Sequence, residues 1–169
     1  PVCDMLGGRV RDEVEFASYL FFKFGADDEY GEVLNAESLL ELAKLFHDRH
    51  GFQVHKVKAG VLSLDEDVEA VRLLRRHFGD EHLVRVDATN AWSVDQSAEF
   101  AKHTEAYGVE YLEDPTSGLD NLAELRRRVR VPLSTHTSVS QFGHVAEAVG
   151  KGSIDLVSAE IHKIGGILA

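Results

Sequence analysis

Short apolar runs alternate with amphipathic stretches along most of this 169-residue chain. The apolar runs predict strands at residues 15–23, 52–58, 82–87, 109–113, 131–135 and 154–160. Apolar residues at helical spacing predict helices at residues 35–50, 63–79, 93–108, 120–128 and 141–150. Strands that are apolar on both faces and are each followed by a helix are typical of a parallel sheet covered by helices.

Polar residues at the joints support these boundaries. Asn35 is a good N-cap for the first long helix, and Gly51 stops it. Ser63 or Asp65 caps the second helix, and Ser93 caps the third. Residues 1–14, with charged residues around a Gly-Gly pair, predict a loop or short helix.

Chemistry-bearing side chains recur where successive strands end. They are Lys58, Asp87, Glu113, His136 and Glu160, separated by one strand–helix unit each time. In a (β/α)₈ TIM-type barrel the strand ends converge on one mouth, which carries the active site. A doubly wound open sheet, the rival fold, would gather its site at one switch point. We therefore expect an α/β fold, a partial (β/α)₈ barrel of about six units with an interior packed by Val and Leu.

The composition of the chain limits which partners and which cellular compartment are expected. A net charge of −11 argues against nucleic acid, and the Arg126–Arg128 run suits the solvated face of a helix. The single cysteine, Cys3, excludes an internal disulfide and fits a reducing cytoplasm. No apolar run is long enough to span a bilayer. We expect a cytoplasmic protein without nucleic-acid or membrane partners.

Lys56 and Lys58 end the second predicted strand and share one face of it. Two neighbouring cations disfavour each other's charge, and burial acts in the same direction. A lysine in such surroundings suits a neutral base near pH 7. The simpler alternative, two solvated lysines on an edge strand, is the commoner meaning of an isolated Lys-x-Lys.

Asp87 and Glu113 close two adjacent strands and would lie side by side. Paired carboxylates with room for water suit a hard divalent cation such as Mg²⁺. Either residue alone would more often be a helix cap or part of a salt bridge. Beside the lysine pair they suggest a metal that holds a substrate carboxylate, with a lysine removing the α-proton to form an enediolate.

Four motifs resemble the enolase superfamily: Lys56-Val57-Lys58, the strand end at 86–92, Tyr111-Leu112-Glu113-Asp114-Pro115, and Ile164-Gly165-Gly166. The mandelate racemase-like branch is nearer, and the runs at 1–11 and 19–21 look most like its glucarate dehydratase group. The resemblance implies that residues 1–14 end a connection from a missing capping domain. Residues 15–169 would be an incomplete C-terminal barrel domain without strands seven and eight.

The resemblance also implies roles for single residues. Lys58 would be the catalytic base, and Lys56 would contact the substrate carboxylate as its electrostatic neighbour. Asp87 and Glu113 would be metal ligands. Tyr19, Thr89 and Asn90 would contact substrate, with Thr89 in place of a family asparagine. Glu160 stands where the family has an aspartate that orients a catalytic histidine.

His136 departs from the family, which has an asparagine or an acid there as the third metal ligand. Imidazole is a poor partner for Mg²⁺ and a better one for Mn²⁺, Fe²⁺ or Zn²⁺. His136 is therefore either a metal ligand, with Mn²⁺ possible, or a substrate contact. The residue after Glu113 is Asp114, and Leu119 lies where some glucarate dehydratases place a ligand. Glu113 is still the best candidate for the second metal ligand.

These features imply a metal-dependent dehydratase that acts on a small sugar acid, glucarate-type or another. Two alternatives stay open: a racemase or epimerase on the same scaffold, and a non-catalytic relic of the barrel. We expect the full-length protein to be a homo-oligomer.

Overall fold

The computed structural model describes residues 1–166; the last three residues of the predicted domain lie outside it. Six strands form one sheet: β1 (Ser18–Phe21), β2 (Val54–Lys58), β3 (Leu83–Asp87), β4 (Leu112–Glu113), β5 (Leu133–Thr135) and β6 (Leu156–Val157). The helices are α1 (Val2–Met5), α2 (Ala36–His50), α3 (Leu64–Phe78), α4 (Val94–Thr104), the 3₁₀ helix η1 (Glu105–Tyr107), α5 (Leu119–Arg126) and α6 (Phe142–Lys151).

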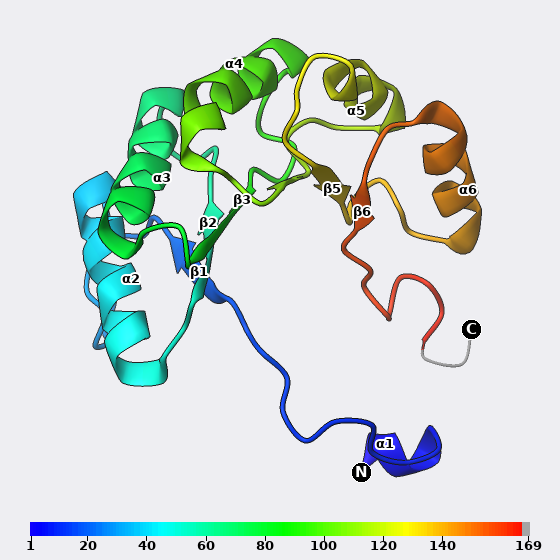
Figure 1. Ribbon diagram of the computed structural model, residues 1–169, viewed down its shortest axis with the longest axis horizontal. Coiled ribbons are helices and arrows are strands. Elements are labelled where there is room, and N and C mark those ends of the chain that lie inside the picture. Colours follow the sequence, from blue (N-terminus) through cyan, green and yellow to red (C-terminus); the bar gives the residue numbers. More distant parts are fainter. Residues whose placement is uncertain (167–169) are drawn as a thin grey trace.

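Each strand is parallel to the next one along the chain, in the order β1 to β6. Figure 1 shows the strands on the inside of an arc and helices α2 to α6 on its outside. Within the described residues β1 and β6 do not pair, so the sheet curves without closing. The prediction of a partial (β/α)₈-type barrel with six strands is confirmed.

Several predicted boundaries are wrong by a few residues. The predicted strands at 15–23 and 154–160 shrink to β1 and to the two-residue β6, so Glu160 follows a loop rather than a strand. Residues 105–107 form the separate η1, and α5 begins at Leu119 after Gly118. Ladder pairing with a neighbour, rather than apolar composition, decides where a strand ends.

The predicted caps are confirmed. Asn35 accepts a hydrogen bond from the Ser38 N–H, and the Ser38 hydroxyl reaches back to the Asn35 N–H. Ser93 and Gln96 form the same reciprocal pair at the start of α4, and the Ser63 side chain accepts from the Glu66 N–H at the start of α3. Gly51 ends α2 with φ of 72°, a left-handed conformation that glycine adopts without strain. Local capping chemistry therefore fixes these helix ends.

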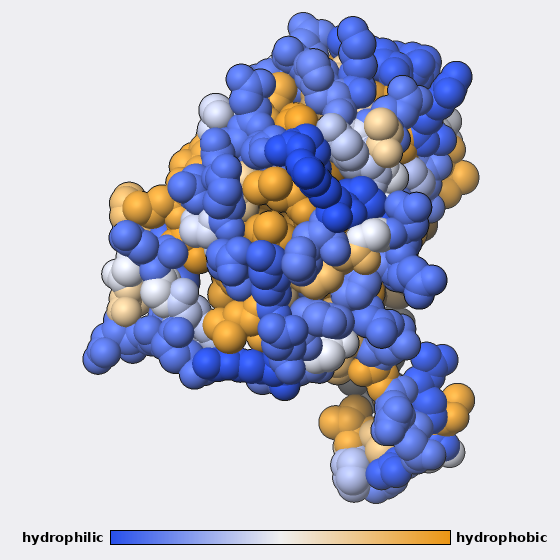
Figure 2. Space-filling view, turned by 60° about the vertical axis from the view of Figure 1, so that its left-hand side comes forward, coloured by the Kyte–Doolittle hydropathy of each residue, from blue (hydrophilic) through white to orange (hydrophobic). Residues whose placement is uncertain are grey.

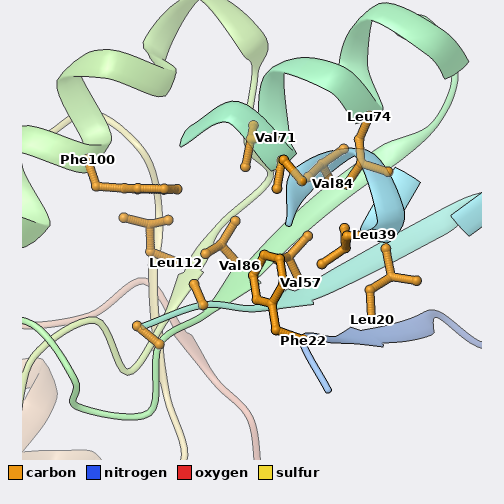
Figure 3. Packing of buried hydrophobic residues seen from close by; sticks show 14 of the residues in the cluster. Leu20, Phe22, Leu39, Val57, Val71, Leu74, Val84, Val86, Phe100 and Leu112 are labelled. Carbon is orange, nitrogen blue, oxygen red and sulfur yellow. The ribbon is translucent and has the colours of Figure 1, made fainter. Parts of the chain in front are cut away.

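The hydrophobic core lies between the sheet and the helices. Figure 3 shows Val57, Val84, Val86 and Leu112 of the strands facing helix residues such as Leu39, Val71, Leu74 and Phe100. Burying each such side chain stabilises the fold by about 1.5–3 kcal/mol. The expectation that Val and Leu also fill the barrel interior is wrong. The other face of β2, β3 and β4 carries Lys56, Arg85 and Glu113, because residues alternate between faces along a strand.

Hydrophilic residues dominate the face shown in Figure 2, with smaller apolar areas between them. The N-terminal arm with α1 extends away from the barrel segment in Figure 1. None of the helices described is long and apolar enough to cross a membrane.

Three histidines, His47, His55 and His82, form a cluster on the helix side of β2. The fully buried His55 ring places Nδ1 2.8 Å from the Ser18 hydroxyl and Nε2 3.2 Å from Nδ1 of His82. Phe78 stacks on His55 at 4.5 Å between ring centroids. Burial, with the neighbouring His82 and His47, lowers the pKa of His55 to about 4. The folded chain therefore holds His55 neutral at pH values where an exposed histidine is half protonated.

We predict that this cluster makes the fold acid-sensitive. Because the folded pKa of His55 lies below the unfolded value, its contribution to stability is complete above pH 6.5 and is lost as the pH falls toward 4. At about 1.4 kcal/mol per pKa unit, the loss is about 3 kcal/mol. Denaturant titrations from pH 4 to 8 should show a weaker pH dependence for His55→Gln. The exposed control His103→Gln should follow the parent, and an unchanged pH dependence in His55→Gln would contradict the prediction.

Candidate active site

The strand register places the predicted site residues at one level. Lys58 pairs with Asp87 across β2 and β3, and Asp87 pairs with Glu113 across β3 and β4. Phe21 of β1 pairs with Lys58 on the other side. Since neighbouring parallel strands lie about 4.8 Å apart, these side chains leave the sheet edge close together.

A network of charges joins these side chains on the inner face. Lys56 Nζ lies 2.8 Å from Glu113 Oε2 and 3.3 Å from Asp87 Oδ2. Lys58 Nζ lies 3.3 Å from the same Asp87 oxygen. The Tyr19 hydroxyl donates to it at 2.5 Å, and the Tyr19 ring lies 5.0 Å from Lys56 Nζ. Lys56 thus bridges the two buried carboxylates.

This network keeps Lys56 and Asp87 charged. Burial acts to lower the pKa of Lys56, but the hydrogen bond to Glu113 and the charge of Asp87 outweigh it, so the pKa is raised. Burial acts to raise the pKa of Asp87, but hydrogen bonds from Tyr19 and Thr89 and the lysine charges hold it below its usual range. The prediction that the neighbouring lysine and burial lower the pKa of each lysine is therefore wrong for Lys56. The nearby carboxylates raise its pKa by more than burial and the neighbouring cation lower it.

Thr89 and Asn90 form a turn after β3 with φ of 45° and 65°. A β-branched residue with positive φ is strained by roughly 1–3 kcal/mol, and such strain persists where the surroundings enforce it. The Thr89 N–H and hydroxyl both donate to Asp87 Oδ1, and Lys58 Nζ donates to the Thr89 hydroxyl. The turn therefore ties Lys58 to Asp87.

Asp114 organises the segment that follows β5. It is fully buried with φ of 42°, and its carboxylate accepts hydrogen bonds from the hydroxyls of Thr135 and Thr137 and the backbone N–H groups of His136 and Thr137. These four donors occupy the carboxylate's acceptor positions. Asp114 thus fixes the backbone that presents His136.

His136 points into the same mouth. Its Nδ1 lies 2.6 Å from Asp114 Oδ2 and 3.2 Å from Glu113 Oε1, yet it is buried and makes no properly oriented hydrogen bond. Glu113, Asp114 and His136 offer ligand atoms within 4.8 Å of one another. An unpaired buried nitrogen facing a carboxylate fits a divalent cation with mixed nitrogen and oxygen ligands. Asp114, like Asp87, already accepts hydrogen bonds through both carboxylate oxygens, whereas those of Glu113 are made through Oε2. Glu113 Oε1 and His136 Nδ1 could therefore supply ligand atoms more readily than either aspartate.

A cavity of about 380 Å³ opens at this mouth. It is lined by most of the residues that the sequence predicted: Tyr19, Lys56, Lys58, Asp87, Thr89, Glu113, His136 and Glu160. Asn90 is not among the lining residues. Its side-chain amide donates to the Thr137 hydroxyl at 3.2 Å, and its backbone N–H donates to Asp114.

The sequence reading missed Ser158 and Asp114. Ser158 lines the cavity and donates to Glu113 Oε2 at 3.0 Å. Its position two residues before Glu160 offered a signal, since alternate residues share a face. Glu160 lies at the rim, 2.8 Å from Lys163 Nζ and 3.6 Å from His136 Nε2. The hydrogen bond from Lys163 lowers the pKa of Glu160.

A larger cavity, about 880 Å³, lies on the outer surface beside α4 and the segment before β5. Its lining mixes both charges, and they pair with one another, as in Arg128–Asp95 and Arg130–Glu105. The smaller cavity gathers the lysines and carboxylates that end the strands, so it is the candidate active site.

The chain is a segment of a parallel α/β barrel with lysines and carboxylates at the carboxyl ends of its strands. This arrangement is typical of barrel enzymes, whose active sites lie at that end of the barrel. Residues 38–169 match the family model described as enolase C-terminal domain-like. The chain belongs to this family.

Similar proteins with curated names include dehydratases and an isomerase. The chain is 35% identical to a Streptomyces coelicolor protein named "Probable glucarate dehydratase", over 99% of the chain and 40% of that protein. It is 27% identical to arabinonate dehydratase of Saccharolobus solfataricus, over 99% of the chain and 43% of that protein. It is also 27% identical to muconate cycloisomerase 1 of Pseudomonas putida, over 98% and 42%. The chain thus spans about two fifths of the length of these relatives.

Two solved structures share the fold closely. An enolase from Gibberella zeae complexed with magnesium, formate and sulfate has a TM-score of 0.91 and 36% identity, covering 98% of this chain and 39% of that one. An enolase from Pseudomonas fluorescens with bound magnesium, potassium and tartrate has a TM-score of 0.90 and 36% identity, covering 98% and 40%.

The bridging position of Lys56 leads to a stability prediction. Lys56→Met keeps an unbranched apolar stem but removes the ammonium group and leaves Asp87 and Glu113 as neighbouring buried carboxylates, which should cost about 3 kcal/mol of unfolding free energy. The control Lys44→Met, which breaks a surface pair with Glu41, should cost less than about 1 kcal/mol. Chemical denaturation measures both, and equal effects would refute the bridging role.

Proposed function

We propose that the protein containing this chain is a metal-dependent dehydratase of a sugar acid, of glucarate type. The observation that carries the proposal is Lys58 at the cavity mouth, level with Asp87 and beside Lys56. Identity to proteins named as glucarate and arabinonate dehydratases supports the same chemistry.

In this proposal Lys58, in its neutral form, takes the proton α to the substrate carboxylate. The electron pair of that C–H bond forms a carbon–carbon double bond as the β-hydroxyl leaves, taking up a proton from solvent to give water. The resulting enol then tautomerises to the keto acid. Lys56 binds the substrate carboxylate. Tyr19 contacts the substrate from β1, and Thr89 contacts it from the turn after β3. Glu160 lies at the rim, where it can orient a group on the opposite side of the cavity.

Asp87, Glu113 and His136 are the residues proposed to hold the metal, with Mg²⁺ as first choice and Mn²⁺ as second. A divalent cation there would neutralise the charge that develops on the substrate carboxylate. The unpaired His136 Nδ1 facing Glu113 supports a ligand role, and magnesium in two similar structures supports the choice of ion.

A racemase or epimerase remains the second candidate, because a relative at 27% identity is named as a cycloisomerase, and an isomerisation likewise leaves the molecular formula of its substrate unchanged. The two differ in product. A dehydratase releases water and a keto acid, while a racemase returns the proton and changes only the configuration. Mass analysis of the product separates them.

We predict that Lys58→Ala in the full-length protein abolishes exchange of the substrate α-proton in deuterated solvent. Loss of a general base should lower the rate by about 10² or more. NMR of the recovered sugar acid measures the exchange, and Lys44→Ala on α2 serves as control. Exchange that persists in Lys58→Ala would place the base elsewhere.

We also predict that Asp87→Ala binds Mg²⁺ or Mn²⁺ at least about 10-fold more weakly, because it loses one of the proposed carboxylate ligands. Isothermal titration with each metal measures the affinity, and circular dichroism checks the fold. The exposed Asp48→Ala is the matched control. Undiminished affinity in Asp87→Ala, with activity retained in excess chelator, would refute the metal assignment.

A further inference from the structure

Asp67 is a buried carboxylate that the proposed reaction does not use. It lies in the first turn of α3, is 1% exposed, and accepts a hydrogen bond from the Gly60 N–H at 2.9 Å through Oδ2. Its Oδ1 has no hydrogen-bond partner, and burial raises the pKa of Asp67 to about 7. A half-satisfied buried carboxylate destabilises a fold.

The helix end alone does not explain this residue. Carboxylates favour the first turn of a helix because of the helix dipole, and α3 already has Asp65 and Glu66 there. Asp65 is exposed and meets that need without loss of hydration. Asp67 instead accepts its hydrogen bond from outside the helix, from the Gly60 N–H in the turn after Lys58.

Gly60 packs that turn against the loop that follows β3. Its φ is 80°, and a Cβ placed on it would lie 2.4 Å from Ala91 Cβ and 3.4 Å from the Ala88 carbonyl oxygen. The preceding Ala59 N–H donates to the Asp87 carbonyl at 2.9 Å. The turn after Lys58 and the loop after Asp87 therefore form one packed unit.

The loop against which Gly60 packs contains the strained Thr89–Asn90 turn. Thr89 in turn contacts both Asp87 and Lys58. Strained backbone holds its conformation only where neighbours enforce it, and Gly60 is the neighbour on this side. A displacement of Gly60 would therefore shift the loop that contains Thr89, and Thr89 would in turn shift the Lys58 amine that it contacts.

We infer that Asp67 is a positioning residue: its hydrogen bond to Gly60 fixes the turn that holds Lys58, Asp87 and Thr89 in their relative places. The inference rests on the proposed role of Lys58 for its kinetic consequence. In this role Asp67 acts through the oxygen that accepts the hydrogen bond from Gly60, and its charge is not required.

The test compares acceptor-removing and acceptor-keeping variants of the full-length protein. Asp67→Ala and Asp67→Ser lose the acceptor that reaches Gly60, whereas Asp67→Asn keeps a carbonyl oxygen in its place. Asp65→Ala loses a first-turn carboxylate from the same helix without touching Gly60. Removal of a buried charge favours folding of Asp67→Ala, and Asp67→Ser leaves a smaller void should Asp67→Ala fail to fold.

Two readouts are measured on every variant: kinetics of α-proton exchange with a sugar acid, and the distance between Lys58 Nζ and Asp87 Oδ2 in crystal structures. We expect Asp67→Ala and Asp67→Ser to lower kcat about 10- to 100-fold with KM changed less than about 3-fold, since small misplacements of a reacting group are costly. The distance should lengthen beyond the 3.3 Å of the parent. Asp67→Asn and Asp65→Ala should match the parent in both.

An unchanged kcat and distance in Asp67→Ala and Asp67→Ser would overturn the inference, as would a loss in Asp67→Asn equal to that in Asp67→Ala. If the parent protein exchanges no α-proton, the proposed function fails, and the crystallographic distance then decides the positioning role by itself.

Discussion

The parallel register of the strands is the constraint on which this structure depends. Pairing of Lys58 with Asp87 and of Asp87 with Glu113 brings three consecutive strand–helix units to one level of the sheet. A shift of one residue in any pairing would turn a strand's charged side chains toward the helices and its valines toward the mouth. The apolar face packed on the helices prevents that shift, so the core fixes the geometry of the site.

The inner face of the sheet is unusual for its charge. Two carboxylates that are nearly fully buried stand beside two partly exposed lysines, and hydrogen bonds from Tyr19 and Ser158 complete their shell. Partnerless charges there would be costly, so each side chain depends on the others. Such a group suits the proposed binding of a charged substrate and a cation, because its partners can exchange one ionic contact for another.

Backbone strain is concentrated at the same edge. Thr89, Asn90 and Asp114 are the non-glycine residues with positive φ in the described part of the chain, and all three follow strands at the mouth. Asp114 holds the His136 segment through four hydrogen bonds, and the Gly60 turn lies against the loop of Thr89. Strained backbone persists where the surrounding structure enforces it, and a fixed turn suits the proposed role of Lys58 as a positioned base.

The sequence by itself determined the fold class, the order of the elements, the helix caps and the residues at the strand ends. Apolar periodicity, capping residues and recurrent spacing are local signals, and they place Lys58, Asp87 and Glu113 correctly at the sheet edge. Tertiary structure alone decided the length of β1 and β6, the polar inner face, the bridging of Asp87 and Glu113 by Lys56, and the hydrogen bond from Gly60 to Asp67. These depend on which side chains meet across strands and loops, and on the balance between burial and neighbouring charge, which no local pattern records. Asp67 illustrates the difference: in the sequence it is one of three acids at a helix start, and only the fold buries it against the turn that follows Lys58.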